Sequence, residues 1–60
     1  MAPSQKRILV VEDEKPMAKA LELKLSKEGF LTKSVHNGED ALTTLGEESY
    51  DLVLLDLVMP

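Results

Sequence analysis

The sequence contains no cysteine, which excludes disulfide bonds and any zinc site with cysteine ligands. It also lacks an apolar run of the roughly 18 residues that a membrane-spanning helix needs. The short apolar run after Lys6 and Arg7 is followed at once by acidic residues, so it does not resemble a signal peptide. We therefore expect a soluble, cytoplasmic protein without a membrane contact, in a reducing compartment.

A basic patch is missing as well. The formal net charge is −4, and the chain has no cluster of lysine and arginine of the kind that attracts nucleic acid. The 60 residues make at most one small domain, and a domain of this size buries only about 60% of the surface that its unfolded chain exposes. We expect a marginally stable unit that makes no nucleic-acid contact.

What the sequence does contain is a regular alternation of two hydrophobic patterns. Continuous or alternating apolar runs predict strands, and apolar residues that recur every three or four positions predict helices. After a polar tail at residues 1–6, the predicted elements are a strand at 7–11, a helix at 17–28 with Pro16 in its first turn, an edge strand at 30–35, a helix at 38–46 and a strand from residue 51 or 52 to 57. This order predicts an α/β fold with a parallel sheet and right-handed crossovers.

The helical patterns also predict which side chains face the sheet. In the first helix the apolar stripe consists of Met17, Ala18, Leu21 and Leu25, while Leu23 lies on the opposite face. In the second helix the residues expected to point inward are Ala41, Leu42 and Leu45. Glycine is a common helix stop, and we expect Gly29 and Gly46 to end the two helices.

Three carboxylates fall at strand ends. Glu12 and Asp13 follow the first strand, and Asp56 stands near the end of the third, within the apolar stretch "LVLLDL". The carboxyl ends of parallel strands form one rim where ligands bind, so the three acids converge if these strands are neighbours. Clustered carboxylates suit Mg²⁺, and an aspartate can accept a phosphoryl group covalently.

Plainer interpretations exist for some of these residues. Glu12 and Asp13 could form a negative first helical turn that complements the helix dipole, and His36 beside a turn is expected to be a surface loop residue. Asp56 is harder to explain this way, because a charged residue is almost never fully buried without a partner. We therefore expect a functional role for Asp56.

At this point the sequence resembles one family. "ILVVEDE", "HNGEDAL" and "YDLVLLDLVMP" resemble, in order and spacing, the motifs of the receiver domain of two-component response regulators. The resemblance implies a flavodoxin-like α/β fold of strand order 2-1-3-4-5 with helices on both faces, and residues 7–60 would form the N-terminal half of such a domain. The chain would then be a fragment that ends after the third strand.

The resemblance also implies a site. Asp56 would accept phosphate from a sensor histidine kinase or a phosphotransfer protein, in a reaction that needs Mg²⁺. Asp13, Asp56 and the main-chain carbonyl of Val58 would bind the metal, and Glu12 would act through a water molecule. Receivers place a Ser or Thr, a Lys and a switch aromatic beyond the matched segment, so we expect this chain to be deficient as a switch.

The expected function is that of a phosphorylated signalling switch and not of a turnover enzyme, although the parent domain could phosphorylate and dephosphorylate itself. Two other functions compete with this interpretation. A Mg²⁺-dependent phosphohydrolase with an aspartate nucleophile usually has a second acid two residues later, where this chain has Val58. A pseudo-receiver would bind partners without phosphorylation. The acids Glu12, Asp13 and Asp56 argue against this function for the parent domain, whereas the expected absence of the second half argues for something like it in this fragment.

The third predicted strand has a further consequence. Its apolar residues 52–55 would form a bare sheet edge, and such edges pair with other chains. We expect self-association through this strand about a two-fold axis, with strand order 2-1-3-3'-1'-2'.

Overall fold

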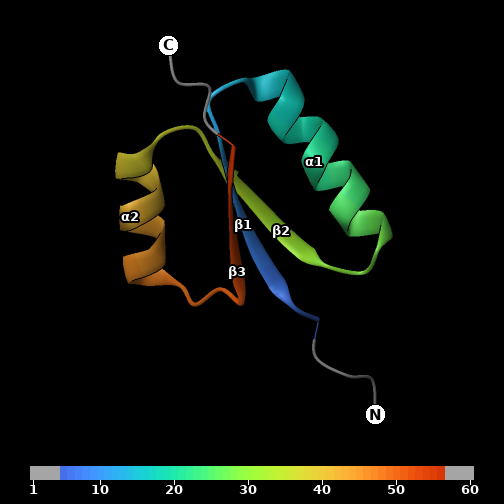
Figure 1. The fold of residues 1–60 in the computed structure, drawn as a ribbon. Coiled ribbons are helices and arrows are strands. Elements are labelled where there is room, and N and C mark those ends of the chain that lie inside the picture. Colours follow the sequence, from blue (N-terminus) through green and yellow to red (C-terminus); the bar gives the residue numbers. More distant parts are fainter. Residues whose placement is uncertain (1–4, 57–60) are drawn as a thin grey trace.

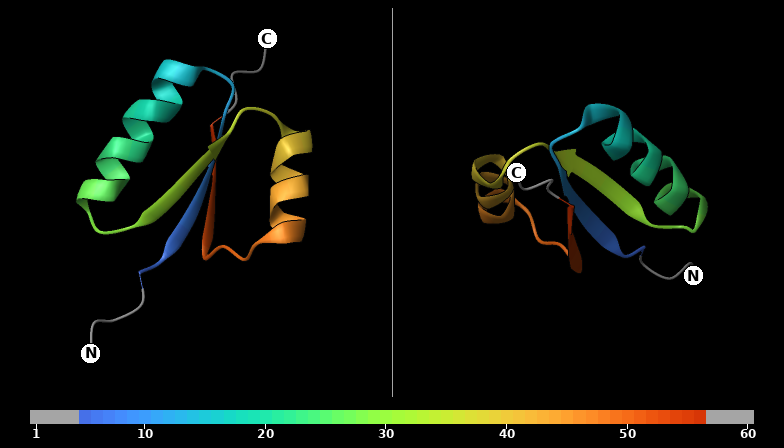
Figure 2. Two further views of the ribbon diagram at one scale, coloured as in Figure 1. Left: turned by 180° about the vertical axis from the view of Figure 1, so that it is seen from behind. Right: turned by 45° about the horizontal axis from the view of Figure 1, so that its top comes forward.

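The computed structural model describes residues 5–56, and the side chains of residues 5–55. Its elements are β1 (Arg7–Glu12), α1 (Lys15–Lys27), β2 (Leu31–Val35), α2 (Gly38–Glu47) and β3 (Leu52–Asp56). The three strands form one parallel sheet of order β2-β1-β3. Helix α1 packs on one face of the sheet and α2 on the other (Figures 1 and 2). The predicted α/β architecture is confirmed for this part of the chain.

Strand β1 is the centre of the molecule because it is apolar on both faces. Leu9, Val10 and Val11 are fully buried or nearly so, and Ile8 is only 3% exposed. On the α2 side, Leu9 and Val11 form a cluster with Val35 and Ala41. Strand β2 alternates between exposed and more buried residues, which confirms its prediction as an edge strand.

The helix ends follow local backbone chemistry. Gly29 has a φ of +94°, a left-handed conformation that glycine adopts without steric cost, and its N–H donates to the Ser26 carbonyl (3.0 Å). It is therefore the predicted stop of α1. The prediction that Gly46 ends the second helix was wrong by one residue, because α2 continues through Gly46 to Glu47. At the start of α2, the Asn37 side chain accepts a hydrogen bond from the Asp40 N–H (2.7 Å).

Several predictions of buried helical side chains were wrong. Leu42 is 74% exposed and Leu45 is 40% exposed, because α2 lies over β1 and turns Ala41 and Thr44 toward the sheet instead. Met17 is 48% exposed, and Ala18 is the buried residue of α1. Leu23 is exposed on α1, in agreement with its predicted position opposite the apolar stripe.

A polar cluster connects the amino end of β1 and the middle of β2 to the segment between α2 and β3. Glu48 accepts hydrogen bonds from Lys33 (3.0 Å), from Tyr50 (3.2 Å) and from Arg7. The Arg7 guanidinium also lies 4.8 Å from the centre of the Tyr50 ring. The hydrogen bond from Lys33, followed by that from Arg7, lowers the pKa of Glu48, whereas burial and Glu48 raise the pKa of Tyr50.

Candidate functional site

The carboxyl ends of the three strands meet at one edge of the sheet because all strands run in the same direction. Strands β1 and β3 are neighbours, and their register pairs Glu12 with Asp56. The sequence-based expectation that these two positions converge is thus met at the level of the backbone. Asp13 is the next residue after Glu12. Val58 lies outside the described residues, as does the side chain of Asp56.

Glu12 and Asp13 have opposite environments. Glu12 is only 2% exposed, although it carries a carboxylate. Its Oε1 atom accepts a hydrogen bond from the Glu14 N–H (3.1 Å), which directs this carboxylate toward the start of α1. Asp13 is exposed to solvent. One acid is therefore enclosed by the fold while its neighbour is open to a ligand.

The structure adds a residue that the sequence pattern did not identify as part of this rim. His36 directly follows β2 and is partly buried. Its Nδ1 atom lies 3.1 Å from the main-chain carbonyl oxygen of Glu12. A carbonyl oxygen can only accept, so Nδ1 carries the proton and donates it. This bond ties the end of β2 to the end of β1. The signal that could have revealed it is the position of His36 at a strand end, on the same rim as Glu12.

No three or more histidine, cysteine, aspartate or glutamate side chains in residues 5–55 lie close enough together to share a metal ion. The predicted ligand set includes the side chain of Asp56 and the main-chain carbonyl of Val58, which lie outside the described part of the chain. The Mg²⁺ site therefore stays a prediction. The oxygen donors that are described at the rim, the buried Glu12 carboxylate and the exposed Asp13, are of the type that Mg²⁺ prefers.

A comparison with family models identifies the chain. The model described as "Response regulator receiver domain" matches residues 8–60. The chain belongs to the response regulator receiver family. No solved structure was found to match it. Neither helix of this receiver has the length and apolarity needed to cross a lipid bilayer, as far as residues 5–56 are concerned.

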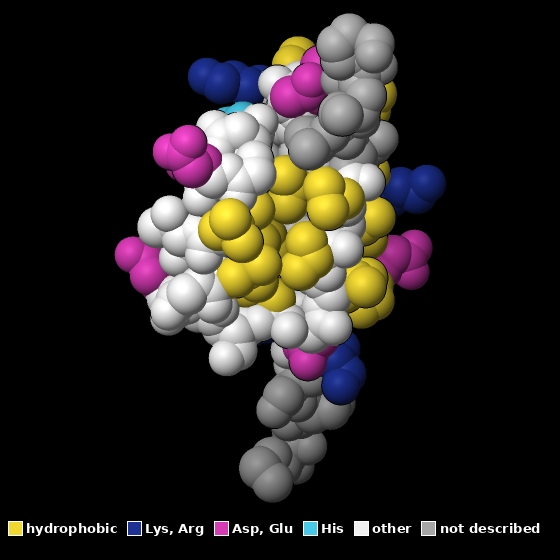
Figure 3. All heavy atoms as spheres, turned by 60° about the vertical axis from the view of Figure 1, so that its left-hand side comes forward, with side chains coloured by type: hydrophobic (Ala, Val, Ile, Leu, Met, Phe, Trp, Pro, Cys, Tyr) yellow, Lys and Arg dark blue, Asp and Glu magenta, His cyan; other side chains and the backbone are white. Residues whose placement is uncertain are grey.

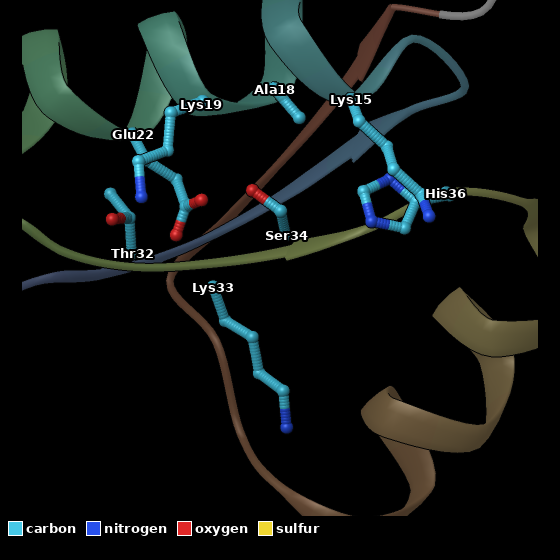
Figure 4. Close-up of a pocket in the computed structure, with 8 residues that line it drawn as sticks. All are labelled: Lys15, Ala18, Lys19, Glu22, Thr32, Lys33, Ser34 and His36. Carbon is cyan, nitrogen blue, oxygen red and sulfur yellow. The ribbon is translucent and has the colours of Figure 1, made fainter.

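Membership in the receiver family supports a role in signalling and agrees with the observed parallel sheet. The acidic rim, and not the cavities of this receiver, is the candidate site. A cavity of about 410 Å³ lies between α1 and β2 and ends beside His36 (Figure 4). Lys15 and His36 both line this cavity, while Lys33 points to the other face of the sheet. Neither Glu12 nor Asp13 lines this cavity.

Proposed function

We propose that this receiver acts in two-component signal transduction by accepting a phosphoryl group on Asp56. The donor would be a phosphohistidine of a sensor histidine kinase or of a phosphotransfer protein. The observation that carries the proposal is the register between β1 and β3, which pairs Asp56 with Glu12 at the carboxyl edge of the sheet in a chain of the receiver family. The absence of cysteine fits a cytoplasmic location.

The proposed transfer is a displacement at phosphorus. A carboxylate oxygen of Asp56 attacks the phosphorus atom, and a P–O bond forms while the P–N bond to the histidine of the donor breaks. The electron pair of the broken bond leaves with the imidazole nitrogen, which takes up a proton. The product on this chain is an acyl phosphate, so no oxidant or reductant is required.

The transfer would depend on Mg²⁺ held by Asp13, Asp56 and the Val58 main-chain carbonyl, with Glu12 acting through water. When bound, the ion supplies positive charge that offsets the charge of the carboxylates and of the phosphoryl group. Two features of the chain support this assignment. Glu12 is enclosed at the rim with 2% of its surface exposed, and its Oε1 is already oriented by the Glu14 N–H. Asp13, which is exposed, is accessible to both an ion and a phosphodonor.

Intact-mass measurement tests the assignment of the phosphoacceptor. The chain is incubated with acetyl phosphate and Mg²⁺, and a mass increase of one phosphoryl group is expected. The Asp56→Asn variant should show no increase. The matched control is Asp51→Asn, because Asp51 is an exposed aspartate just before β3, at the opposite, amino edge of the sheet, and the amide oxygen of asparagine can still accept the hydrogen bond from the Arg7 N–H. This control should be labelled like the unaltered chain, and chelation of Mg²⁺ should abolish labelling of both.

The other outcomes separate the competing functions. Labelling of Asp56→Asn would show that the acceptor is a different residue and would refute the assignment. Continuous release of inorganic phosphate, with turnover far above one equivalent, would indicate a Mg²⁺-dependent phosphohydrolase. A folded chain that gains no phosphoryl group from acetyl phosphate or from a phosphorylated kinase would indicate an interaction module.

A further inference from the structure

The outer edge of β2 is a sheet edge that belongs to the receiver fold itself. In the receiver strand order 2-1-3-4-5, β2 is the last strand on its side of the sheet, and within residues 5–56 it pairs only with β1. The hydrophobic patch in Figure 3 lies on the other side, where α2 and β3 lie and where that order continues with further strands. An added strand is therefore to be expected at β2 and not at β3.

The backbone of this edge presents hydrogen-bonding groups at two positions. The Leu31 N–H donates to the Lys6 carbonyl, on the side of β1 (2.9 Å). The main-chain groups of successive residues in a strand alternate between its two sides, so the N–H and C=O groups of Thr32 and Ser34 point away from β1. These four groups are the donors and acceptors that a further strand would use.

The side chains of the same two residues border a cavity. Figure 4 shows Thr32 and Ser34 directed toward α1, whereas Lys33 points to the other face of the sheet. The cavity of about 410 Å³ is also lined by Lys15 and Lys19 of α1. The Ser34 Oγ atom is buried and has no hydrogen-bond partner among the described residues, which is uncommon for a buried hydroxyl. The cavity is thus suited to a polar side chain that enters from a strand at this edge.

The charges beside the edge favour a carboxylate. The chain as a whole carries a net charge of −4, but Lys15, Lys19 and Lys33 lie beside β2, and the first two form no ion pair within residues 5–55. Two acids are near them. Glu48 is already bonded to Lys33, and Glu22 also lines a second cavity that Lys15 does not line. The end of the first cavity at Lys15 is therefore the cationic one.

We propose that the outer edge of β2 binds an extended acidic segment of a partner protein as an additional antiparallel strand. Such an addition derives affinity from main-chain hydrogen bonds and specificity from pockets for alternate side chains. The partner residues opposite Thr32 and Ser34 exchange main-chain hydrogen bonds with them, and their side chains turn toward α1. A carboxylate in this position meets Lys15 and the Ser34 hydroxyl. The interaction does not depend on phosphorylation of Asp56.

A second copy of β2 fits this edge less well than an acidic segment does. Two β2 strands would bring the lysines beside each of them to one seam, where like charges are destabilising. The segment that fits has acidic residues facing α1 and apolar residues on the other face, beside Leu31, which is 49% exposed. The peptide Val-Glu-Val-Glu-Val has this pattern and provides one residue for each of the 5 residues of β2.

Fluorescence anisotropy of labelled Val-Glu-Val-Glu-Val, with both ends blocked, tests the proposal. Val-Lys-Val-Lys-Val should bind at least about tenfold more weakly, because its charges are reversed. N-methylation of the two glutamates removes the N–H groups that face β2, so it should weaken binding about tenfold or more. N-methylation of the central valine is the matched control. Its N–H points away from the sheet, so binding should change by less than about twofold.

Substitutions on α1 test the cavity. Lys15→Gln removes a positive charge at the cavity and should weaken binding of the glutamate peptide about two- to fivefold, the range of an exposed ion pair. The matched control is Lys24→Gln, because Lys24 is an exposed lysine of the same helix that lines neither of the two cavities beside α1. This variant should bind like the unaltered chain.

Hydrogen exchange locates the contact independently of the substitutions. The amides of Thr32 and Ser34 should exchange more slowly when the peptide is bound, whereas the amide of Lys33, which faces β1, should not change. The proposal is overturned if the two kinds of N-methylation weaken binding equally, or if the lysine peptide binds as well as the glutamate peptide. It is also overturned if the peptide protects amides only outside β2, or if millimolar peptide does not bind.

Discussion

The hydrogen bond between His36 and the Glu12 carbonyl provides a sharp test of how the rim is held. Asparagine can place a donor nitrogen near the position of the histidine Nδ1 atom, whereas glutamine places its nitrogen near the position of Nε2. The bond is made by Nδ1 at 3.1 Å. We therefore expect His36→Asn to preserve the connection between β2 and β1 and His36→Gln to lose it.

The size of the effect follows from the type of bond. A hydrogen bond between neutral groups contributes a net 0.5–1.5 kcal/mol to stability, so His36→Gln should lower the free energy of unfolding by about 1 kcal/mol. At 0.05–0.15 kcal/mol per residue, a chain of this length has a total of roughly 3–9 kcal/mol. With a urea dependence near 1 kcal/mol per molar for a small domain, the midpoint should fall by about 1 M. His36→Asn should shift it by less than half as much.

Urea unfolding followed by circular dichroism measures these differences. The unaltered chain and both variants are compared at one protein concentration and under the same buffer conditions. Nitrogen NMR of the His36 ring supplies a second measurement, in which Nδ1 should be the protonated nitrogen of the neutral ring. If the two variants lose equal stability, or if Nε2 carries the proton, the bond does not hold the rim.

Three further predictions follow from other parts of the molecule. Titration with Mg²⁺ should shift the amide resonances of Asp13, and residues at the opposite end of the sheet should not respond; the reverse pattern would place the metal elsewhere. Glu48→Gln should destabilise the chain most above the ordinary glutamate pKa of about 4.3. The folded-state pKa of Glu48 is lowered, mainly by the hydrogen bond from Lys33, so the contribution of Glu48 to the free energy of unfolding is lost as the pH falls through that lowered value. If urea unfolding shows the same loss of stability in Glu48→Gln at all pH values, this prediction is wrong. Asn37→Ala should cost about 1 kcal/mol in the same assay, because it removes the cap of α2, whereas Asn37→Ser should retain most of the stability.

The succession of strands and helices and the parallel direction of the strands could be predicted from the hydrophobic patterns, whereas the order of the strands in the sheet was an expectation from the family resemblance. The continuous apolar run of β1 requires cover on both faces, and the alternation in β2 requires it on only one. The positions of Glu12 and Asp13 at the end of a buried strand then define the rim. The role expected for Asp56 as a phosphoryl acceptor came from the family motifs, because a hydrophobic pattern does not indicate the chemistry of a single acidic residue.

The remaining features depend on three-dimensional packing that a periodic pattern does not encode. Leu42 fits the apolar stripe expected of α2, yet it is exposed because the helix axis lies over β1. The role of His36 depends on a hydrogen bond to a main-chain atom 24 residues away, and the identity of that partner cannot be inferred from the residues beside His36. The cluster around Glu48 likewise joins side chains from three separate segments.

The central place of β1 in the sheet has a consequence during protein synthesis. β1 leaves the ribosome before β2 and β3, but its pairing with β3 joins residues that are 44 positions apart, as in the bond between Arg7 and Asp51. At a translation rate of about 5–20 residues per second, β1, the most buried of the described strands, waits roughly 2–9 seconds for this partner. During that interval the edge of β1 that will face β3 has no partner strand, and a chaperone that shields this edge would protect the nascent chain from wrong pairing.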